Sequence, residues 1–487
     1  MRFFCNGARW LFLAALVYAP WAYGCTTVST IRGLNLILAA VIALWALSEV
    51  ISYLLSVIGG RGAEGRGQRS DVRGQRSAVR RRGSPDNQQP ITNNSQQRGL
   101  ALLVPCAALL ALGWWMALNA RWIYDSDFLL FAPRGGLIGA GPGSVDYSIS
   151  LAWMVRATLL LGVTLFAAQL CRDPVWLVRL WWTLALTGGS IALLGLAQKA
   201  TGAEMIFWQT TETPVTTFFA TYYYHGNAGA YLNLVFPFSA TLALRAFVRK
   251  SSPLSRAVAL VTCLLVVVAI ASDTSRGGQA VGAILLSGLA ICLRDLLFSR
   301  ARRMEKKTLL TAIAVIGFAI VAIAGVSQLD RSLGRWHQLE ESVSSDSRWL
   351  ATRAATRAIQ DAGLLGFGPG TFRVVFPFYT NGLGPRVGGL WRFLHQDYLQ
   401  TLMEWGWIGS AGWGFLFFGA IWVGSQTLRH RNEVPLSGRQ RLFLTASVLA
   451  LAGVGLHALV DFPLQIASLQ LYVATYVGVG WGLRPSV

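Results

Sequence analysis

Blocks of about 20 apolar residues recur along this chain, and they constrain its fold more than any other feature. A helix of roughly this length crosses the hydrocarbon core of a bilayer. Charged residues make up only 13% of the chain, whereas a soluble protein carries about 25%. The sequence therefore predicts an all-α, polytopic transmembrane helix bundle of about 12 spans. The candidate spans are residues 10–24, 33–58, 99–119, 148–170, 178–198, 226–247, 257–272, 280–298, 308–327, 405–428, 442–460 and 464–482.

The first candidate span is short enough to be a secretory signal peptide, which would be removed from the mature protein. The residues that follow it, 23–28, lack the small-residue pattern of a cleavage site, and a second span comes directly afterwards. We therefore expect the first span to be retained. We also expect no fused soluble domain after the last span.

The net charge of +20 could indicate a nucleic-acid partner, but the positions of the basic residues favour a membrane topology. Lys and Arg concentrate in the cytoplasmic loops of membrane proteins. We therefore predict a cytoplasmic N-terminus, a cytoplasmic C-terminus and no nucleic-acid partner, because anionic membrane lipid accounts for most of the basicity. With that orientation, the basic loops are 59–98, 171–177, 245–256, 294–307 and 429–441, together with the tail at Arg484.

The spans and loops divide the chain into five segments. The loop at 59–98 is rich in Gly, Arg, Gln and Ser and nearly free of large apolar residues, so we expect it to be disordered and cytoplasmic. The outer loop at 120–147 has Gly and Pro punctuation without a helical period, which predicts irregular structure. The segments are 1–58 (two spans), 59–98, 99–327 (spans three to nine), 328–404 (a long outer loop) and 405–487 (the last three spans).

The long outer loop contains a predicted helix over residues 346–362. Arg348, Arg353 and Arg357 lie near one face of this helix. A basic amphipathic helix beside a membrane usually lies in the interface plane, but it can also present arginines to a lipid diphosphate. The following G-F-G-P-G-T-F, residues 366–372, predicts a tight turn at the membrane face.

The same loop ends in W-R-F-L-H-Q-D-Y-L-Q, residues 391–400, directly before the tenth span. This position places His395 and Asp397 just outside the membrane. We interpret His395 as a candidate catalytic residue beside a lipid-linked substrate, and Asp397 as a possible contact to donor or acceptor.

Two other polar clusters open or join spans on the outer side. Tyr224, His225 and Asn227 open the sixth span, where they either bind a polar headgroup or sugar, or serve as an interfacial anchor and helix cap. Ser275 and Arg276 lie in the short outer link 272–279. An arginine has no topological use there, so it either contacts an anion or snorkels to the interface.

A last polar pair lies at the outer end of span eleven. His457 and Asp461 are one helical turn apart and face the same side. They either form a structural hydrogen-bonded pair or take part in catalysis. All four clusters fall on the outer face in the predicted topology, and their convergence there predicts an active site.

The residue types at this face favour phosphate chemistry without a bound metal. The outer loops contain no D-x-D and no paired carboxylate motif, and the six cysteines form no metal-ligand spacing. Guanidinium groups can hold a diphosphate leaving group bidentately, and a histidine can remove a proton from an acceptor hydroxyl. Together these groups predict glycosyl transfer from a lipid diphosphate, without a cofactor.

Four motifs resemble those of the O-antigen ligase and O-antigen polymerase superfamily. They are S-R-G at 275–277, Arg348 followed by the 366–372 motif, H-Q-D-Y-L-Q at 395–400 with E-W-G-W-I-G at 404–409, and H-A-L-V-D-F-P at 457–463. The resemblance covers roughly residues 215–465. It implies a multi-pass protein of the bacterial inner membrane with a long periplasmic loop and a part in lipopolysaccharide or other polysaccharide biosynthesis.

The resemblance also implies a reaction and roles for residues. The reaction is transfer of a glycan from undecaprenyl diphosphate to an acceptor hydroxyl, without metal and usually with inversion. His395 corresponds to the proposed base, and Arg276 and Arg348 to the arginines that bind the diphosphate. Family members often carry a basic residue where residues 222–224 are tyrosines here, and H-N-D is commoner than the H-Q-D at 395–397.

The sequence leaves the acceptor open, since a glycan, a lipid or a protein could each supply the hydroxyl. A ligase and a polymerase would share the same donor chemistry. A polysaccharide or lipid transporter is a further alternative, but it predicts inverted repeats and polar residues at mid-membrane, and neither is evident. A purely structural scaffold would leave Arg276 and His395 without a role.

Overall fold

The structure is a computed structural model that describes residues 2–64, 91–125, 127–128, 130–139, 141–210, 217–249, 251–301, 347–383, 387, 391–430 and 436–483. Most of the described chain is helical, as predicted. The long helices are α1 (Arg2–Trp21), α2 (Val28–Glu64), α3 (Ile91–Leu118), α4 (Tyr147–Leu170), α5 (Pro174–Ala200), α6 (His225–Val248), α7 (Pro253–Ser272), α8 (Arg276–Ala301), α14 (Asp397–Arg429), α15 (Gly438–His457) and α16 (Ala467–Gly482).

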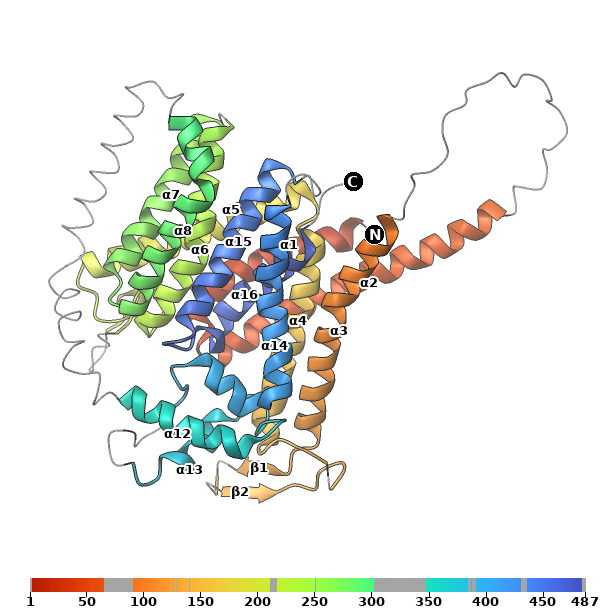
Figure 1. The fold of residues 1–487 in the computed structure, drawn as a ribbon, viewed down its shortest axis with the longest axis vertical. Helices are drawn as coiled ribbons and strands as arrows, with labels where there is room; N and C mark the ends of the chain where they lie inside the picture. The colour runs from red at the N-terminus through yellow and green to blue at the C-terminus, as the bar shows by residue number, and fades with distance from the viewer. Residues whose placement is uncertain are drawn as a thin grey trace.

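The long helices form one bundle around α16 (Figure 1). Every residue of α16 is buried, and the helix packs against α4, α14, α15 and α1. Its burial explains why its sequence is apolar on all sides rather than on one face. The pair α7 and α8 lies at one flank of the bundle, and α2 and α3 lie at the other (Figure 1).

The helices agree with most of the predicted spans. In the described residues, nine helices are long and apolar enough to cross a membrane, namely α2 to α8, α14 and α15. The predicted span at 10–24 overlaps α1, and the span at 464–482 overlaps α16, which has 16 residues. The predicted span at 308–327 lies outside the described residues. The total of twelve spans therefore stays a prediction, whereas the all-α polytopic bundle is confirmed.

The boundaries of two helices differ from the predicted ones. α2 continues to Glu64 and α3 begins at Ile91, so both helices extend into the segment 59–98 that was expected to be disordered. Residues 65–90 of that segment lie outside the described residues.

Four further elements cover one end of the bundle, which we call the loop-covered end (Figure 1). They are the helices α12 (Ser347–Ala362) and α13 (Phe372–Thr380) and the strands β1 (Trp122–Asp125) and β2 (Leu130–Pro133). The predicted helix at 346–362 is confirmed as α12. The expectation of irregular structure at 120–147 is wrong in part, because β1 and β2 pair as an antiparallel hairpin with Trp122 opposite Pro133.

A small core of its own holds the loop-covered end together. The buried face of α12 is a stripe of alanines, which lets α13 and α14 approach closely. Side chains of α13 such as Phe372 and Phe376, together with Leu394 and Met403, complete this cluster. The predicted turn is present, since Gly366, Gly368 and Gly370 all have positive φ angles. The described part of the loop, residues 347–383, 387 and 391–396, therefore packs as a layer over the bundle.

A kink in α14 joins this layer to the bundle. The helix is interrupted at Gly406, which has φ 59° and ψ −167°. The predicted tenth span at 405–428 matches the part after the kink. Residues 397–405 form an additional first segment of α14, which packs with the loop layer through Met403 and directly follows His395.

Candidate active site

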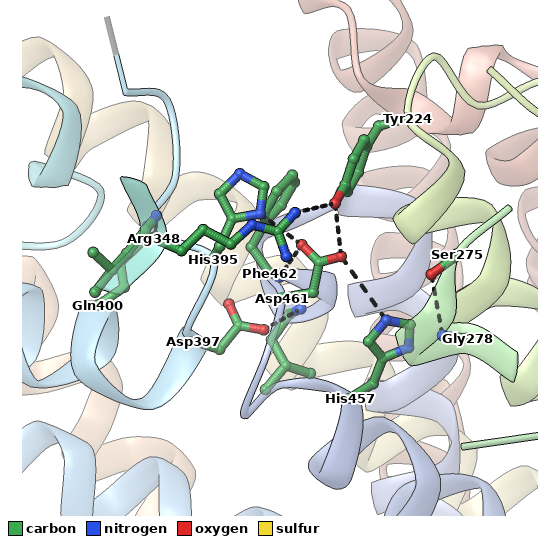
Figure 2. Close-up of polar contacts among 12 residues, drawn as sticks. Tyr224, Ser275, Gly278, Arg348, His395, Asp397, Gln400, His457, Asp461 and Phe462 are labelled. Atoms are coloured by element: carbon green, nitrogen blue, oxygen red, sulfur yellow. Dashed lines mark hydrogen bonds and ion pairs between the residues drawn. The ribbon is translucent and has the colours of Figure 1, made fainter. Parts of the chain in front are cut away.

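The centre of the candidate site is a contact between His395 and Asp461 (Figure 2). Nδ1 of His395 lies 3.0 Å from Oδ1 of Asp461. The Asp461 side chain is 7% exposed and the His395 side chain 22%, so the carboxylate is enclosed while the imidazole keeps access to solvent. His395 has a φ of 61°, in the left-handed region that non-glycine residues seldom adopt. Such conformations cluster at functional sites.

Asp461 collects several donors around one carboxylate. Its Oδ2 accepts a hydrogen bond from the Tyr224 hydroxyl at 3.1 Å, and its Oδ1 accepts one from the backbone N–H of Phe462 at 3.1 Å. Nε2 of His457 lies 3.9 Å from Oδ2. Gly226 makes this approach possible, because a Cβ at that position would lie 2.3 Å from Oδ2 of Asp461.

These contacts fix the charge states of Asp461 and Tyr224. Burial by itself would raise the pKa of Asp461, but the hydrogen bond and charge of His395, with His457 and Arg348, lower the pKa below its usual value. Burial and the Asp461 charge raise the pKa of Tyr224 above its usual value. At neutral pH Asp461 is therefore a carboxylate, and Tyr224 is a phenol that donates to it.

Arg348 reaches the site from the first turn of α12. Its Nη2 donates to the Tyr224 hydroxyl at 3.1 Å, and Figure 2 shows its guanidinium beside Tyr224 and Asp461. The residue is exposed, so the guanidinium can still meet a ligand. Arg353 is also exposed, and in the described part of the chain no contact joins it to His395 or Asp461.

The S-R-G motif approaches the site from another side. Ser275 accepts a hydrogen bond from the N–H of Gly278 at 3.0 Å and so caps the start of α8 (Figure 2). A Cβ on Gly277 would lie 3.4 Å from Nε2 of His457. Arg276, the first residue of α8, is half-buried between these two neighbours in sequence. The four clusters therefore meet at one place in the molecule.

The sequence of the central region is similar to that of a known family. A family model described as O-antigen ligase matches residues 261–414. This match supports the O-antigen ligase superfamily. No curated protein matches the chain. The matched region includes Arg276, Arg348 and His395, whereas Tyr224 and Asp461 lie outside it. The family and the nine apolar helices together identify a multi-pass membrane protein.

An aromatic enclosure surrounds the histidine in this O-antigen ligase-like protein. The His395 ring meets Phe462, Tyr224 and Trp391 edge to face, with ring centroids 4.6, 5.8 and 6.0 Å away. Tyr224 and Phe462 stack on each other at 5.4 Å. These rings shield one side of the imidazole and fix its orientation toward Asp461.

Asp397 fastens the end of the loop beneath the site. Its carboxylate accepts hydrogen bonds from the N–H of Leu464 at 2.8 Å and from Nε2 of Gln465 at 3.0 Å. Its backbone N–H donates to the carbonyl of Ala458 at 3.0 Å. Asp397 is fully buried. These partners hold residues 458–465 against the loop, and with them Asp461 against His395.

The remaining predicted residues lie at the start of α6. His225 is buried and its ring lies 4.7 Å from that of Tyr224. Asn227 is 4% exposed, and its Oδ1 has no hydrogen-bond partner in the described residues. Asn227 therefore keeps a polar atom in the interior that a ligand could satisfy. Among the described residues, no three His, Cys, Asp or Glu side chains are grouped so that they could hold a metal ion.

Sequence reasoning missed the main pairing of the site. The sequence indicates Asp461 only as a partner of His457, whereas the structure places it closer to His395, 66 residues away. Tyr224 was noted without its link to Asp461 across 237 residues. The acidic residue one turn after His457 was the only signal in the sequence, and it could not reveal which histidine the carboxylate contacts.

Proposed function

We propose that the protein is a membrane glycosyltransferase that moves a glycan from undecaprenyl diphosphate to an acceptor hydroxyl, without a metal. The observation that carries this proposal is the 3.0 Å contact between His395 and Asp461. A histidine that a buried carboxylate orients is a recurring arrangement for a general base. The O-antigen ligase family match supports the same class of reaction.

The contact determines which nitrogen of His395 acts. Nδ1–H donates to the Asp461 carboxylate, so the lone pair lies on Nε2. In the reaction, Nε2 takes the proton from the acceptor hydroxyl while the oxygen attacks the anomeric carbon. The bond from that carbon to the diphosphate oxygen breaks, and its electron pair leaves with the diphosphate. Attack opposite the leaving group inverts the anomeric configuration.

Arg276 and Arg348 bind the diphosphate in this proposal. Arg348 already lies beside the His395–Asp461 dyad through its 3.1 Å hydrogen bond to Tyr224. Arg276 is the first residue of α8, and the next residue, Gly277, lies against His457. Two guanidinium groups offset the charge that develops on the leaving group. Tyr224, His225, Asn227, Ser275 and Arg353 are the further residues that we propose for contacts to donor or acceptor.

The proposal includes the cellular setting. The protein lies in a bacterial inner membrane with both termini in the cytoplasm, and the loop-covered end faces the periplasm. The acceptor is a glycan, lipid or protein hydroxyl. A polymerase that adds one donor to the glycan of another would use the same dyad and the same arginines, so the acceptor alone separates a polymerase from a ligase.

The decisive experiment uses purified protein and a fluorescent undecaprenyl-diphosphate-linked repeat unit, with products separated on a gel. A ladder of multiples without another acceptor identifies a polymerase. Product only after addition of a glycolipid such as lipid A-core identifies a ligase. His395→Ala abolishes either product, while His430→Ala at the far end of α14 serves as the matched control and keeps it. An active His395→Ala protein refutes the base assignment.

Two further readouts separate the alternatives. Arg276→Lys impairs transfer, because an ammonium group cannot reproduce the bidentate contact of a guanidinium, whereas full activity would indicate a snorkelling side chain. A chelator leaves the rate unchanged if no metal is required. If the His395→Ala protein moves labelled lipid-linked glycan across vesicle membranes without forming any transfer product, the transporter alternative is favoured.

A further inference from the structure

Three arginines lie at the end of the bundle opposite the loop-covered end. Arg245 lies in the last turn of α6, Arg249 caps that helix, and Arg439 lies in the first turn of α15. Arg245 comes 20 residues after His225, the first residue of α6, which is about 30 Å along the helix axis. This length matches the thickness of a bilayer core. The three arginines therefore lie at the level of the headgroups of one leaflet, and the candidate active site lies at the level of the other.

The positive charges of these arginines act on one another without a compensating acid. α6 and α15 pack side by side, and Arg249 and Arg439 lie near enough for their charges to act on that of Arg245. Like charges at such range repel each other. The first turn of a helix also disfavours a cation, which adds to the cost at Arg439. Within the described residues, no carboxylate forms an ion pair with any of the three arginines.

Two of the three guanidinium groups are partly buried and keep an unsatisfied donor. The Nε atoms of Arg245 and Arg439 are buried, and neither has a hydrogen-bond partner in the part of the chain that the structure describes. The Arg245 guanidinium lies over the ring of Trp181, 5.6 Å from the ring centroid. This cation–π contact covers one face of the guanidinium, but it leaves the in-plane N–H groups without an acceptor. Because buried charges require partners, the arrangement calls for an anion with several oxygen atoms.

Exposed apolar side chains lie in the same stretch of chain as two of these arginines. Phe247, between Arg245 and Arg249 on α6, is 46% exposed. Leu254, the second residue of α7, is 74% exposed, and α7 packs against α6. A soluble anion would have no use for this apolar surface, whereas a phospholipid places its phosphate on basic groups and its acyl chains on apolar ones. The surroundings therefore favour a lipid as the source of the anion.

We infer that Arg245, Arg249 and Arg439 form a binding site for an anionic phospholipid of the leaflet opposite the loop-covered end. The lipid phosphate accepts hydrogen bonds from α6 and α15 together, and a headgroup with two phosphates matches the three positive charges best. The bound lipid therefore joins the two helices at this end. At their other ends, α6 begins beside Tyr224 and α15 ends at His457. The lipid site does not depend on the proposed transfer reaction.

The test measures lipid binding to the purified full chain in a neutral detergent by native mass spectrometry. Cardiolipin, which carries two phosphates, is the probe, phosphatidylcholine is the zwitterionic control, and inorganic pyrophosphate is the soluble anion. Cardiolipin should bind at least about tenfold more tightly than phosphatidylcholine, and pyrophosphate at the same concentration should not displace it. Arg439→Gln should weaken cardiolipin binding about fivefold, and Arg439→Lys only about twofold, since lysine keeps the charge but not the planar fork.

Further variants keep the result interpretable. Arg249→Gln changes an exposed side chain and is the second test where Arg439→Gln fails to fold; it should also weaken cardiolipin binding about fivefold. The double variant should lose at least about tenfold. Arg294→Gln is the matched control, because Arg294 is an exposed arginine near the end of α8 that already pairs with Asp295 at 3.5 Å. It should bind cardiolipin as wild type does.

Three outcomes would overturn the inference. Unchanged cardiolipin binding by the double variant would remove the arginines from any lipid site. Displacement of cardiolipin by pyrophosphate would make the site one for a soluble polyanion. An equal loss in Arg294→Gln would mean that the lipid responds only to the overall surface charge. His395→Ala should bind cardiolipin as wild type does, so failure of the proposed transfer reaction and failure of this lipid site give different results.

Discussion

Replacement of Asp461 by Asn tests the proposed dyad most directly, because it keeps the shape of the side chain and removes its charge. The carboxylate accepts hydrogen bonds from His395, Tyr224 and the Phe462 N–H. An amide has only one acceptor oxygen, so its NH₂ group must face at least one of these donors. His395 then loses the contact that fixes its tautomer and its orientation.

The size of the effect follows from that contact. A hydrogen bond to a charged group contributes about 1.5–3 kcal/mol, and each 1.4 kcal/mol is about a factor of ten in rate. We therefore expect Asp461→Asn to lower kcat by roughly 10- to 150-fold. Removal of the whole base in His395→Ala should cost about 10²- to 10⁴-fold.

A double-mutant cycle shows whether Asp461 acts through His395. Transfer of the fluorescent glycan is measured for wild type, both single variants and the double variant. In the His395→Ala background, Asp461→Asn should change the residual rate by less than about twofold. Asp361→Asn is the matched control, because this exposed carboxylate accepts from Tyr379 at 2.8 Å away from the dyad.

The same factor for Asp461→Asn in both backgrounds would refute the reasoning, because it would mean that Asp461 acts independently of the histidine. Melting temperatures of all four proteins accompany the rates. A rate loss that tracks a fall in melting temperature would assign Asp461 to the fold rather than to the positioning of His395.

Three further predictions concern the surroundings of the dyad. Gly226→Ala should reduce transfer at least about tenfold, because the added Cβ would lie 2.3 Å from Oδ2 of Asp461. Gly438→Ala is the control and should keep normal transfer, because nothing lies within 4 Å of a Cβ at that position. Equal activities of the two variants would contradict this prediction. Glu404→Gln should lower the free energy of unfolding by about 1–3 kcal/mol, because an amide cannot accept hydrogen bonds from the N–H groups of both Gly370 and Phe372. Thermal unfolding measures this change, and an unchanged melting temperature would count against the prediction. The lowered pKa of Asp461 contributes stability that is fully present above the unfolded value of about 3.9 and is lost as pH falls through the folded value. The melting-temperature difference between wild type and Asp461→Asn should therefore be constant from about pH 5 to 8 and shrink in acid, and a difference that grows in acid would refute the assignment.

The membrane helices could be predicted because each one forms an apolar block that is long enough to be recognised from composition alone. The segment that forms α12 could also be predicted, and its arginines repeat near one face of a helix. The hairpin of β1 and β2 was not, because four-residue strands give too short a pattern, and the Gly and Pro residues around them indicate a loop equally well. α2 and α3 extend beyond the predicted spans into polar sequence, where hydropathy does not indicate a membrane helix.

The residues of the candidate site could be proposed from the sequence, but their contacts with one another could not. His395, Arg276 and Arg348 stand out because polar residues beside apolar spans need a reason. Which carboxylate meets His395 depends on how the end of α15 packs against the start of α14. That packing is set by the Asp397 hydrogen bonds to residues 464 and 465, and no local pattern encodes it.

The central position of α16 has a consequence for how the protein is made. Helices enter the membrane in the order of synthesis, N-terminal first, and α16 is the last helix that the structure describes. The helices that surround α16 are therefore synthesised before it, and the space between them is filled only when α16 is inserted. Asp461, six residues before α16, is delivered at the same late moment. In the proposed transfer reaction, a nascent chain that already carries His395 therefore cannot orient this histidine before Asp461 and α16 are in place.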